Sequence, residues 1–233
     1  MISITHAPFP GDIFHSRLPI LKVNEIFYSI QGESSFAGWP CIFVRLTGCN
    51  LRCSYCDTQY AYQEGKELSL DVIIKQIEKY RCSLVEITGG EPLIQEETPL
   101  LISNLLDKGY RVLLETNGSL DVSMIDRRCV RIIDIKLPGS GEVHRNFLEN
   151  LNELHDKDEL KFVIGGQNDY VYAKEILNRI PEGLSEKIVI NFSPLWGMME
   201  PALLADWILN DRLTVRLNIQ LQKIIWPPGM RGV

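Results

Sequence analysis

Three cysteines lie within one short segment, Gly48-Cys49-Asn50-Leu51-Arg52-Cys53-Ser54-Tyr55-Cys56. Thiolates are ligands of zinc and of iron–sulfur clusters. A structural zinc site needs four protein ligands, and no fourth Cys or His lies nearby in the sequence. A 4Fe–4S cluster held by only three thiolates instead leaves one iron open for a reacting ligand. The C-x3-C-x2-C spacing therefore favours such a cluster. Zinc with a distant fourth ligand such as Cys82 or Cys129, or reactive surface thiols, remain alternatives.

Two further polar segments each follow a run of apolar residues. The first is Thr88-Gly89-Gly90-Glu91-Pro92, in which the glycines allow the backbone to approach a ligand closely and present its carbonyl groups. The second is Glu115-Thr116-Asn117-Gly118, where Glu115 could bind a ligand or only solvate a strand end. Two later segments, Asp134-Ile135-Lys136 and Ser193-Pro194-Leu195-Trp196, stand in the same kind of position.

The elements that would position these segments are alternating strands and helices. A helix is expected after Ser69, a second from Thr98 to Gly109, and a third between Asn168 and Pro181. An earlier strand, Glu25 to Ile30, is expected to precede the alternating units. The later strands are predicted at Cys41 to Leu46, Leu84 to Thr88, Arg111 to Glu115, Val130 to Lys136, Leu160 to Ile164, Ile188 to Phe192 and Leu213 to Leu221.

About six such units predict an α/β fold with a largely parallel sheet. A complete eight-unit barrel takes about 250 residues, and this chain has 233 residues, of which about forty precede the units. We therefore expect an incomplete TIM-like βα barrel of about six parallel strands, forming a single domain over residues 1–233. Chemistry in such folds lies at the carboxyl ends of the strands, where every segment named above falls.

Composition narrows the possible partners and location. The chain carries 24 Lys and Arg against 30 Asp and Glu, a net charge of −6, so we expect a small-molecule partner and no nucleic acid. No apolar run is long enough to cross a bilayer, so no membrane association is expected. The first twenty residues show no charged segment leading into an apolar one, which predicts a cytoplasmic location.

The cysteine spacing, with Tyr55 before the last cysteine, resembles the radical S-adenosylmethionine (SAM) superfamily, and Gly89-Gly90-Glu91-Pro92 resembles its GGEP motif. The resemblance implies a radical SAM core in which Cys49, Cys53 and Cys56 hold a 4Fe–4S cluster. The open iron would bind SAM, whose reductive cleavage gives a 5′-deoxyadenosyl radical. The positions that this resemblance assigns to cofactor binding are Tyr55, Cys56, Asp57, Gly90, Glu115, Asp134, Lys136 and Ser193.

Within the superfamily, four segments resemble the 7-carboxy-7-deazaguanine synthase family. They are Phe27 to Ser34, Phe43 to Asn50, Cys56-Asp57-Thr58 and Gln220 to Val233. The resemblance makes Thr58 a Mg2+ ligand, with Arg45 able to pair with a substrate carboxylate or to form a structural ion pair. Many relatives read Gln-x-His-Lys where this chain has Gln222, so nothing is carried over to Gln222. The substrate-binding positions implied are Ile30, Gln31, Gly32, Glu33, Arg45 and Thr88.

This resemblance implies a lyase activity on a pterin, with queuosine or another 7-deazapurine as the end product of the pathway. The expected reaction converts 6-carboxy-5,6,7,8-tetrahydropterin to 7-carboxy-7-deazaguanine with loss of ammonia. An electron donor such as flavodoxin or ferredoxin and a homodimeric assembly are also expected. The main alternative is an activase that makes a glycyl radical on a partner protein. A non-enzymatic iron–sulfur or zinc regulatory protein is a further alternative.

Overall fold

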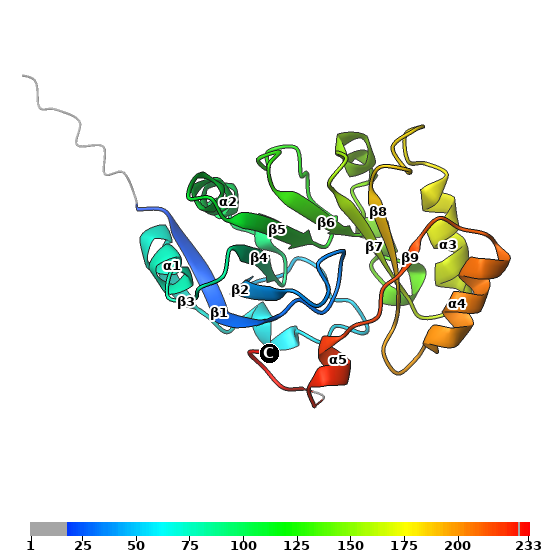
Figure 1. Cartoon of the computed structure of the whole chain (residues 1–233), viewed down its shortest axis with the longest axis horizontal. Coiled ribbons are helices and arrows are strands. Elements are labelled where there is room, and N and C mark those ends of the chain that lie inside the picture. The colour runs from blue at the N-terminus through cyan, green and yellow to red at the C-terminus, as the bar shows by residue number, and fades with distance from the viewer. Residues whose placement is uncertain (1–17, 228) are drawn as a thin grey trace, which may run out of the picture.

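A nine-stranded sheet runs through the part of the chain that the computed structural model describes, residues 18–227 and 229–233. The order of its strands is β3-β1-β2-β4-β5-β6-β7-β8-β9, and it curves into an open trough (Figure 1). β1 is antiparallel to β2 and β3, and all pairings from β2 to β9 are parallel. The strands are β1 (Ile20–Ile30), β2 (Pro40–Leu46), β3 (Lys66–Ser69), β4 (Leu84–Gly89), β5 (Arg111–Thr116), β6 (Val130–Asp134), β7 (Glu159–Ile164), β8 (Val189–Pro194) and β9 (Arg216–Leu217). This arrangement confirms the predicted α/β class and partial barrel.

Helices cover the outer face of the trough (Figure 1). They are α1 (Leu70–Ile77), α2 (Thr98–Asp107), α3 (Gln167–Leu177) and α4 (Pro201–Asn210). A short α5 (Gln222–Ile225) near the C-terminus lies apart from them, on the open side of the trough. Short 3-10 segments lie in the connections, at Gln59–Tyr62, Pro92–Ile94, Pro138–Ser140, Val143–Arg145 and Leu148–Glu153. The three helices expected from the sequence are α1, α2 and α3. Ser69 occupies the N-cap of α1 without a side-chain capping bond, and Gly109 adopts the predicted left-handed conformation after α2.

Strand periodicity sorts the side chains into an outer apolar layer and an inner layer of mixed character, because successive residues of a strand point to opposite faces. In β4, Val85 and Ile87 join the apolar core under α1 and α2. Leu84, from the same strand, joins a separate cluster with Phe27, Cys41, Phe43, Leu113, Val130 and Ile132. This second cluster fills the interior of the trough below the carboxyl ends of the strands, and the polar residues that follow along each strand rest on it.

The last predicted strand, Leu213 to Leu221, is wrong in extent. Only Arg216 and Leu217 form β9, and the chain leaves the sheet after Asn218, whose N–H donates to the carbonyl of Phe192 at 2.9 Å. Leu221 N–H then donates to the carbonyl of Gly32 at 3.0 Å, which draws the segment across the open side of the trough. A bond to the loop after β1 thus replaces continued pairing with β8.

Three elements were not predicted from the sequence: β3, α4 and α5. β3 extends the sheet by pairing with the first residues of β1, which begins at Ile20 rather than at Glu25. α4 starts at Pro201, a residue that favours the first helical turn. No helix among the described residues is both long and apolar enough to span a bilayer. Residues 1–17, on which the absence of a leader segment was predicted, lie outside the described residues, so that prediction and the single-domain boundary of 1–233 are not tested.

Candidate functional site

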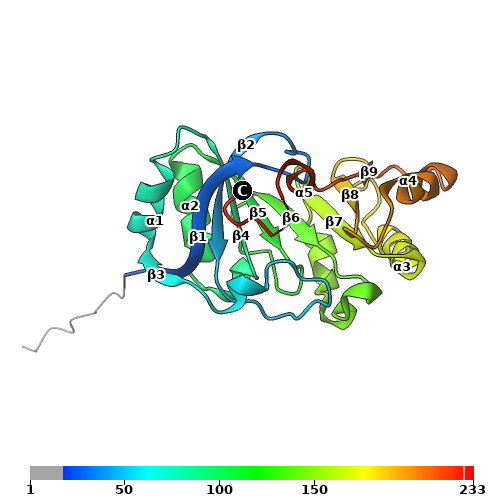
Figure 2. The same cartoon turned by 90° about the horizontal axis from the view of Figure 1, so that it is seen from below.

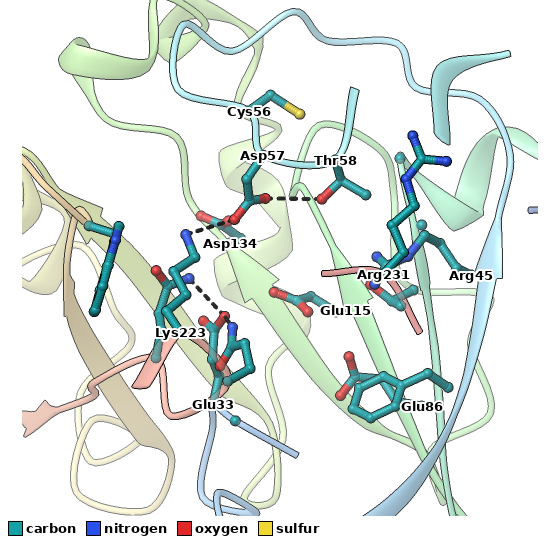
Figure 3. Close-up of a pocket in the computed structure, with 18 of the residues that line it drawn as sticks. Glu33, Arg45, Cys56, Asp57, Thr58, Glu86, Glu115, Asp134, Lys223 and Arg231 are labelled. Atoms are coloured by element: carbon teal, nitrogen blue, oxygen red, sulfur yellow. Dashed lines mark hydrogen bonds and ion pairs between the residues drawn. The ribbon is translucent and has the colours of Figure 1, made fainter. Parts of the chain in front are cut away.

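A cavity of about 670 Å3 opens at the carboxyl ends of the parallel strands. It is lined by every predicted site residue except Ser193. Figure 3 shows charged side chains converging on this cavity from the cysteine loop, from the strands and from the C-terminal segment, whose Lys223 and Arg231 were not predicted. Ser193 is buried behind the wall, where it accepts a hydrogen bond from the side chain of Asn218 at 3.0 Å, and its neighbours Leu195 and Trp196 line the cavity instead.

The cysteine loop follows β2 and forms one wall of the cavity. Its start is fixed by two backbone bonds of Gly48, which donates to Ala61 at 2.8 Å and accepts from Glu91 at 2.8 Å. Cys49, Cys53 and Cys56 all line the cavity, and burial raises the pKa of the Cys49 and Cys53 thiols. Among the described residues, no three His, Cys, Asp or Glu side chains are grouped so as to hold a single metal ion.

Zinc coordination through a distant cysteine therefore has no support in the geometry. Cys129 belongs to the core under α1 and α2, and Cys82 packs beside the apolar cluster inside the trough, so neither lines the cavity. A 4Fe–4S cluster makes a different demand, because each thiolate binds a different iron and the sulfurs need not meet at one point. Three cavity-facing cysteines without a fourth fit that donor set.

Two N–H groups point at the sulfur of Cys49. The backbone N–H of Leu51 lies 3.4 Å from Sγ, and the side-chain amide of Asn117 donates to it at 3.8 Å. Donors of this kind favour the thiolate form that a metal cluster requires. Asn117 also donates to the side chain of Asn50 at 3.0 Å, so the segment after β5 is tied to the cysteine loop.

The glycine pair after β4 packs directly against the cysteine loop. A Cβ atom on Gly90 would lie 2.7 Å from Cβ of Cys49 and would overlap the carbonyl oxygen of Gly48. The next residue, Glu91, is fully buried and accepts hydrogen bonds from Leu93 N–H, the Thr116 hydroxyl and Asn117 N–H. Gly90 thus permits the close approach, and Glu91 is a structural link between the loops after β4 and β5.

The side of the cavity next to the cysteines contains a buried ion pair. Lys136 Nζ lies 2.8 Å from Oδ2 of Asp134. Burial alone would lower the pKa of Lys136, but attraction to Asp134 and to Cys53 outweighs it and raises the pKa. Tyr55 is half-buried, and burial raises the pKa of its phenol. This side of the cavity therefore combines an aromatic ring with one fixed positive and one fixed negative group.

The opposite side contains acidic residues around one lysine. Lys161 Nζ lies 2.6 Å from Glu33 and 2.7 Å from Glu115. Burial opposes its positive charge, yet these two carboxylates outweigh burial and raise the pKa of Lys161 well above its usual value. Gln31 donates to Glu86 at the base of the same region. The predicted residues Gln31, Glu33 and Glu115 are thus brought together by Lys161 and Glu86, which were not predicted.

Arg45 forms the structural ion pair that the sequence left open as an alternative. Its Nε lies 2.8 Å from Glu25, which also accepts the Tyr60 hydroxyl at 3.0 Å. A guanidinium carries five N–H donors, so this pair leaves donors for a ligand. Arg231 Cζ lies 3.8 Å from the centroid of the Tyr60 ring, and Arg45 Cζ lies 5.9 Å from the same centroid. Two arginines therefore lie against one aromatic ring at this end of the cavity, and Figure 3 shows Arg45 and Arg231 side by side there.

The C-terminal segment covers the open side of the cavity. Seen from below in Figure 2, it passes in front of the central strands. Gln220 and Gln222 both donate to Oε1 of Glu33, at 2.9 and 2.7 Å, and Lys223 pairs with Asp57 at 2.8 Å. Other residues of this segment that line the cavity are Trp226, Pro227, Gly229, Met230, Arg231, Gly232 and Val233. None of these residues was predicted individually from the sequence.

Comparison with known proteins assigns this chain to a superfamily and to a family within it. The model of the radical SAM superfamily matches residues 43–180. A 7-carboxy-7-deazaguanine synthase of Chlorobaculum tepidum is 48% identical over 217 residues, which cover 91% of this chain and 97% of that protein. One of Koribacter versatilis is 42% identical and covers 91% of this chain and all of that protein. The chain belongs to the 7-carboxy-7-deazaguanine synthase family of the radical SAM superfamily.

A solved structure supports the fold assignment of this synthase family member. The crystal structure of QueE from Escherichia coli superposes with a TM-score of 0.72 at 23% identity, covering 86% of this chain and 94% of that one. Membership in the synthase family disfavours the activase and regulatory-protein alternatives.

Proposed function

We propose that this protein converts 6-carboxy-5,6,7,8-tetrahydropterin to 7-carboxy-7-deazaguanine with loss of ammonia, in 7-deazapurine (queuosine) biosynthesis. One observation carries the proposal. A single cavity has the three cluster-type cysteines on one side and a set of hydrogen-bonding and charged groups, suited to a carboxylated pterin, on the other. The family assignment supports the same reaction, because the relatives compared above are 7-carboxy-7-deazaguanine synthases.

The residues on the cysteine side fit a 4Fe–4S cluster and SAM. Cys49, Cys53 and Cys56 would hold the cluster, and the N–H donors on Cys49 match a thiolate ligand. When bound, these cofactors supply a 5′-deoxyadenosyl radical for hydrogen abstraction from C6 of the substrate. Tyr55, Asp57 and Gly90 are the remaining candidates for SAM contacts on that wall. Glu115, which the resemblance assigns to SAM, lies on the opposite side of the cavity with Lys161. Lys136 and Asp134, held together at 2.8 Å, would contribute a fixed pair of opposite charges.

The opposite side would bind the pterin. Arg45 would pair with the carboxylate through the guanidinium N–H groups that Glu25 does not engage, because a fork of donors suits a carboxylate. Gln31 and Glu33 would face polar atoms of the pterin ring, since an amide and a carboxylate together supply both donors and acceptors. Ile30, Gly32 and Thr88 complete this wall. These contacts to the carboxylate and the ring would hold C6 in place while the radical forms.

Thr58 is the candidate Mg2+ ligand. Its hydroxyl donates to Asp57 at 3.0 Å, so its oxygen lone pairs remain for a hard cation, together with substrate oxygens and water. We expect Thr58→Ala to raise the Mg2+ concentration that half-maximal turnover requires, while SAM cleavage without Mg2+ changes little. Equal Mg2+ dependence in both proteins would argue against this ligand.

The C-terminal segment would exclude water from the reacting centre. Trp226 and Met230 place apolar surface over the cavity, and Gln220 and Gln222 bind the segment to Glu33. Shielding a radical from competing hydrogen donors is a requirement of this chemistry. The proposal also includes a homodimeric assembly, a cytoplasmic location and an electron donor such as flavodoxin or ferredoxin, all of which stay predictions.

The test is a reconstituted reaction under anaerobic conditions. The protein is loaded with iron and sulfide and mixed with reductant, SAM, Mg2+ and 6-carboxytetrahydropterin, and the products are identified by mass spectrometry. We expect 7-carboxy-7-deazaguanine together with 5′-deoxyadenosine. Formation of 5′-deoxyadenosine without a deazapurine product would show that the radical chemistry is right and that the substrate is wrong.

A further inference from the structure

Glu86 is a carboxyl group at the base of the cavity that the proposed reaction does not use. It lies on β4 with only 2% of its surface exposed, and it faces the inside of the trough. Its register partners in the sheet are Phe43 of β2 and Leu113 of β5, both members of the apolar cluster inside the trough. A carboxyl group in these surroundings needs polar partners, because a buried polar group without them is strongly destabilising.

The first partner of Glu86 is the side-chain amide of Gln31. Nε2 of Gln31 donates to Glu86, and Oε1 of Gln31 accepts the backbone N–H of Glu33 at 3.1 Å. Because a backbone N–H can only donate, the atom that faces it must be the amide oxygen. The amide of Gln31 is therefore held in one orientation, with Glu86 on the nitrogen side.

The second feature is the balance of charge around Glu86. Glu33 from the loop after β1 and Glu115 from β5 share one cation, Lys161 of β7. Glu86 takes part in no ion pair among the described residues, and its other titratable neighbour, Cys41 of β2, is a buried thiol.

Arg45 also attracts Glu115 but is itself paired with Glu25, so the three carboxyl groups have one ammonium group as their ion-pair partner. This excess of carboxyl groups favours a proton on one of them. Glu86 and Glu115 are within hydrogen-bonding reach of each other. Burial raises the pKa of Glu86 well above its usual value, the charge of Glu115 and this hydrogen bond add to the effect, and Lys161 acts against it.

We propose that Glu86 is a positioning residue for substrate, which as a neutral acid accepts from Gln31 and donates to Glu115, so that the three side chains present one fixed hydrogen-bonding pattern. The inference rests on the proposed function and deepens it. The second N–H of the Gln31 amide then faces the cavity as a donor. Glu115 keeps carboxylate oxygen as an acceptor. A ligand that matches this pattern has an acceptor next to a donor on one edge of its ring, the acceptor facing Gln31 and the donor facing Glu115. The 2-amino-4-oxopyrimidine part of a pterin has such an edge.

Two substitutions separate a neutral Glu86 from an ionised one. In Glu86→Gln, the amide oxygen can accept from Gln31 and the amide nitrogen can donate to Glu115, so we expect KM for the pterin to stay within about threefold of wild type. In Glu86→Val, Gln31 loses its acceptor, and we expect KM to rise by about tenfold to a hundredfold. In both variants KM for SAM should be unchanged. Glu78→Gln, the same chemical change on an exposed carboxylate, is the matched control.

The experiment measures KM and kcat for the pterin, and binding of the pterin to the reconstituted protein without reductant, in all four proteins. An infrared difference spectrum of wild type minus Glu86→Gln at neutral pH reports the carbonyl band of a protonated carboxyl group. Rescue by glutamine but not by valine, together with this band, is the expected result. An equal loss of binding in both variants, wild-type binding by Glu86→Val, or absence of the band would overturn the proposal. A wild-type protein that neither binds nor converts the pterin would refute the proposed function, and the infrared band would still test the proton on Glu86.

Discussion

Lys161 offers a direct test of how the acidic side of the cavity is held together. Its ammonium group lies 2.6 Å from Glu33 and 2.7 Å from Glu115, and its side chain is only 8% exposed. Lys161→Met keeps much of the side-chain volume and removes the charge, leaving both carboxylates without their cation. Removing one partner from a buried ion pair lowers the free energy of unfolding by about 3–5 kcal/mol.

The two carboxylates are partly exposed, so we expect the loss of unfolding free energy to lie at the low end of that range. The side chains of Glu33 and Glu115 are 15% and 27% exposed, so water reaches them in part and we expect a loss near 3 kcal/mol. For a chain of this size, that corresponds to a fall of about 6–12 °C in melting temperature. Lys108→Met is the control, because Lys108 pairs with Glu78 on the surface, where both side chains are nearly half exposed. It should lose about 1 kcal/mol or less.

The assay is thermal and urea unfolding of the anaerobically reconstituted proteins. The double variant Lys161→Met/Glu115→Gln should recover part of the loss, because one of the two unpaired carboxylates is then neutral. If Lys161→Met is no less stable than Lys108→Met, the buried charge cluster does not stabilise the fold, and the reasoning given for the acidic side of the cavity is wrong.

Three further predictions follow from the same geometry. Because the pKa of Glu86 is raised above its usual 4.5, its stabilising contribution is fully present below that pH and is lost as pH rises through the folded-state pKa. In urea unfolding, the free energy of unfolding of wild type relative to that of Glu86→Gln should therefore fall as the pH rises. A difference that stays constant with pH would contradict this. Cys53→Ala should abolish reductive SAM cleavage, whereas Cys129→Ala, outside the cavity, should retain it; surviving cleavage in Cys53→Ala would defeat the cluster assignment. Gly90→Ala should lower the free energy of unfolding by about 1–3 kcal/mol and reduce iron loading, because the added Cβ would overlap the cysteine loop. Gly166→Ala is the control, since a Cβ there meets nothing within 4 Å, and it should change little. Equal effects of the two substitutions would show that the cysteine loop does not need the glycine at position 90.

The sequence predicted the strands that carry the site, because each is a short apolar run followed by polar residues. For β2, β4, β5, β7 and β8, predicted and observed bounds agree to within two residues. Those polar residues could be found because parallel strands bring their carboxyl ends to one edge, and all but Ser193 line one cavity. Ser193 was misplaced because the position of a residue after a strand does not say whether its side chain faces the cavity or the wall.

The C-terminal segment could not be predicted, since its strict alternation of apolar and polar residues also suits a strand. What decides against a strand is a contact distant in sequence, between Leu221 and Gly32. Glu86 and Lys161 were missed for a different reason. Each is a charged residue inside a buried strand, which is a signal that sequence reasoning can use, because such a residue must face a polar interior or a partner.

In the proposed reaction, the cavity holds C6 of a tetrahydropterin against the radical carbon. The most direct measurement uses 6-carboxytetrahydropterin deuterated at C6 and determines the masses of 5′-deoxyadenosine and SAM during the reconstituted reaction. Loss of ammonia converts the substrate to product without net oxidation, so a hydrogen must be returned after the abstraction, and SAM can be re-formed when 5′-deoxyadenosine returns it. We expect deuterium from C6 to appear in 5′-deoxyadenosine or in SAM as 7-carboxy-7-deazaguanine accumulates. Product formation with deuterium in neither molecule would show that the hydrogen comes from another position.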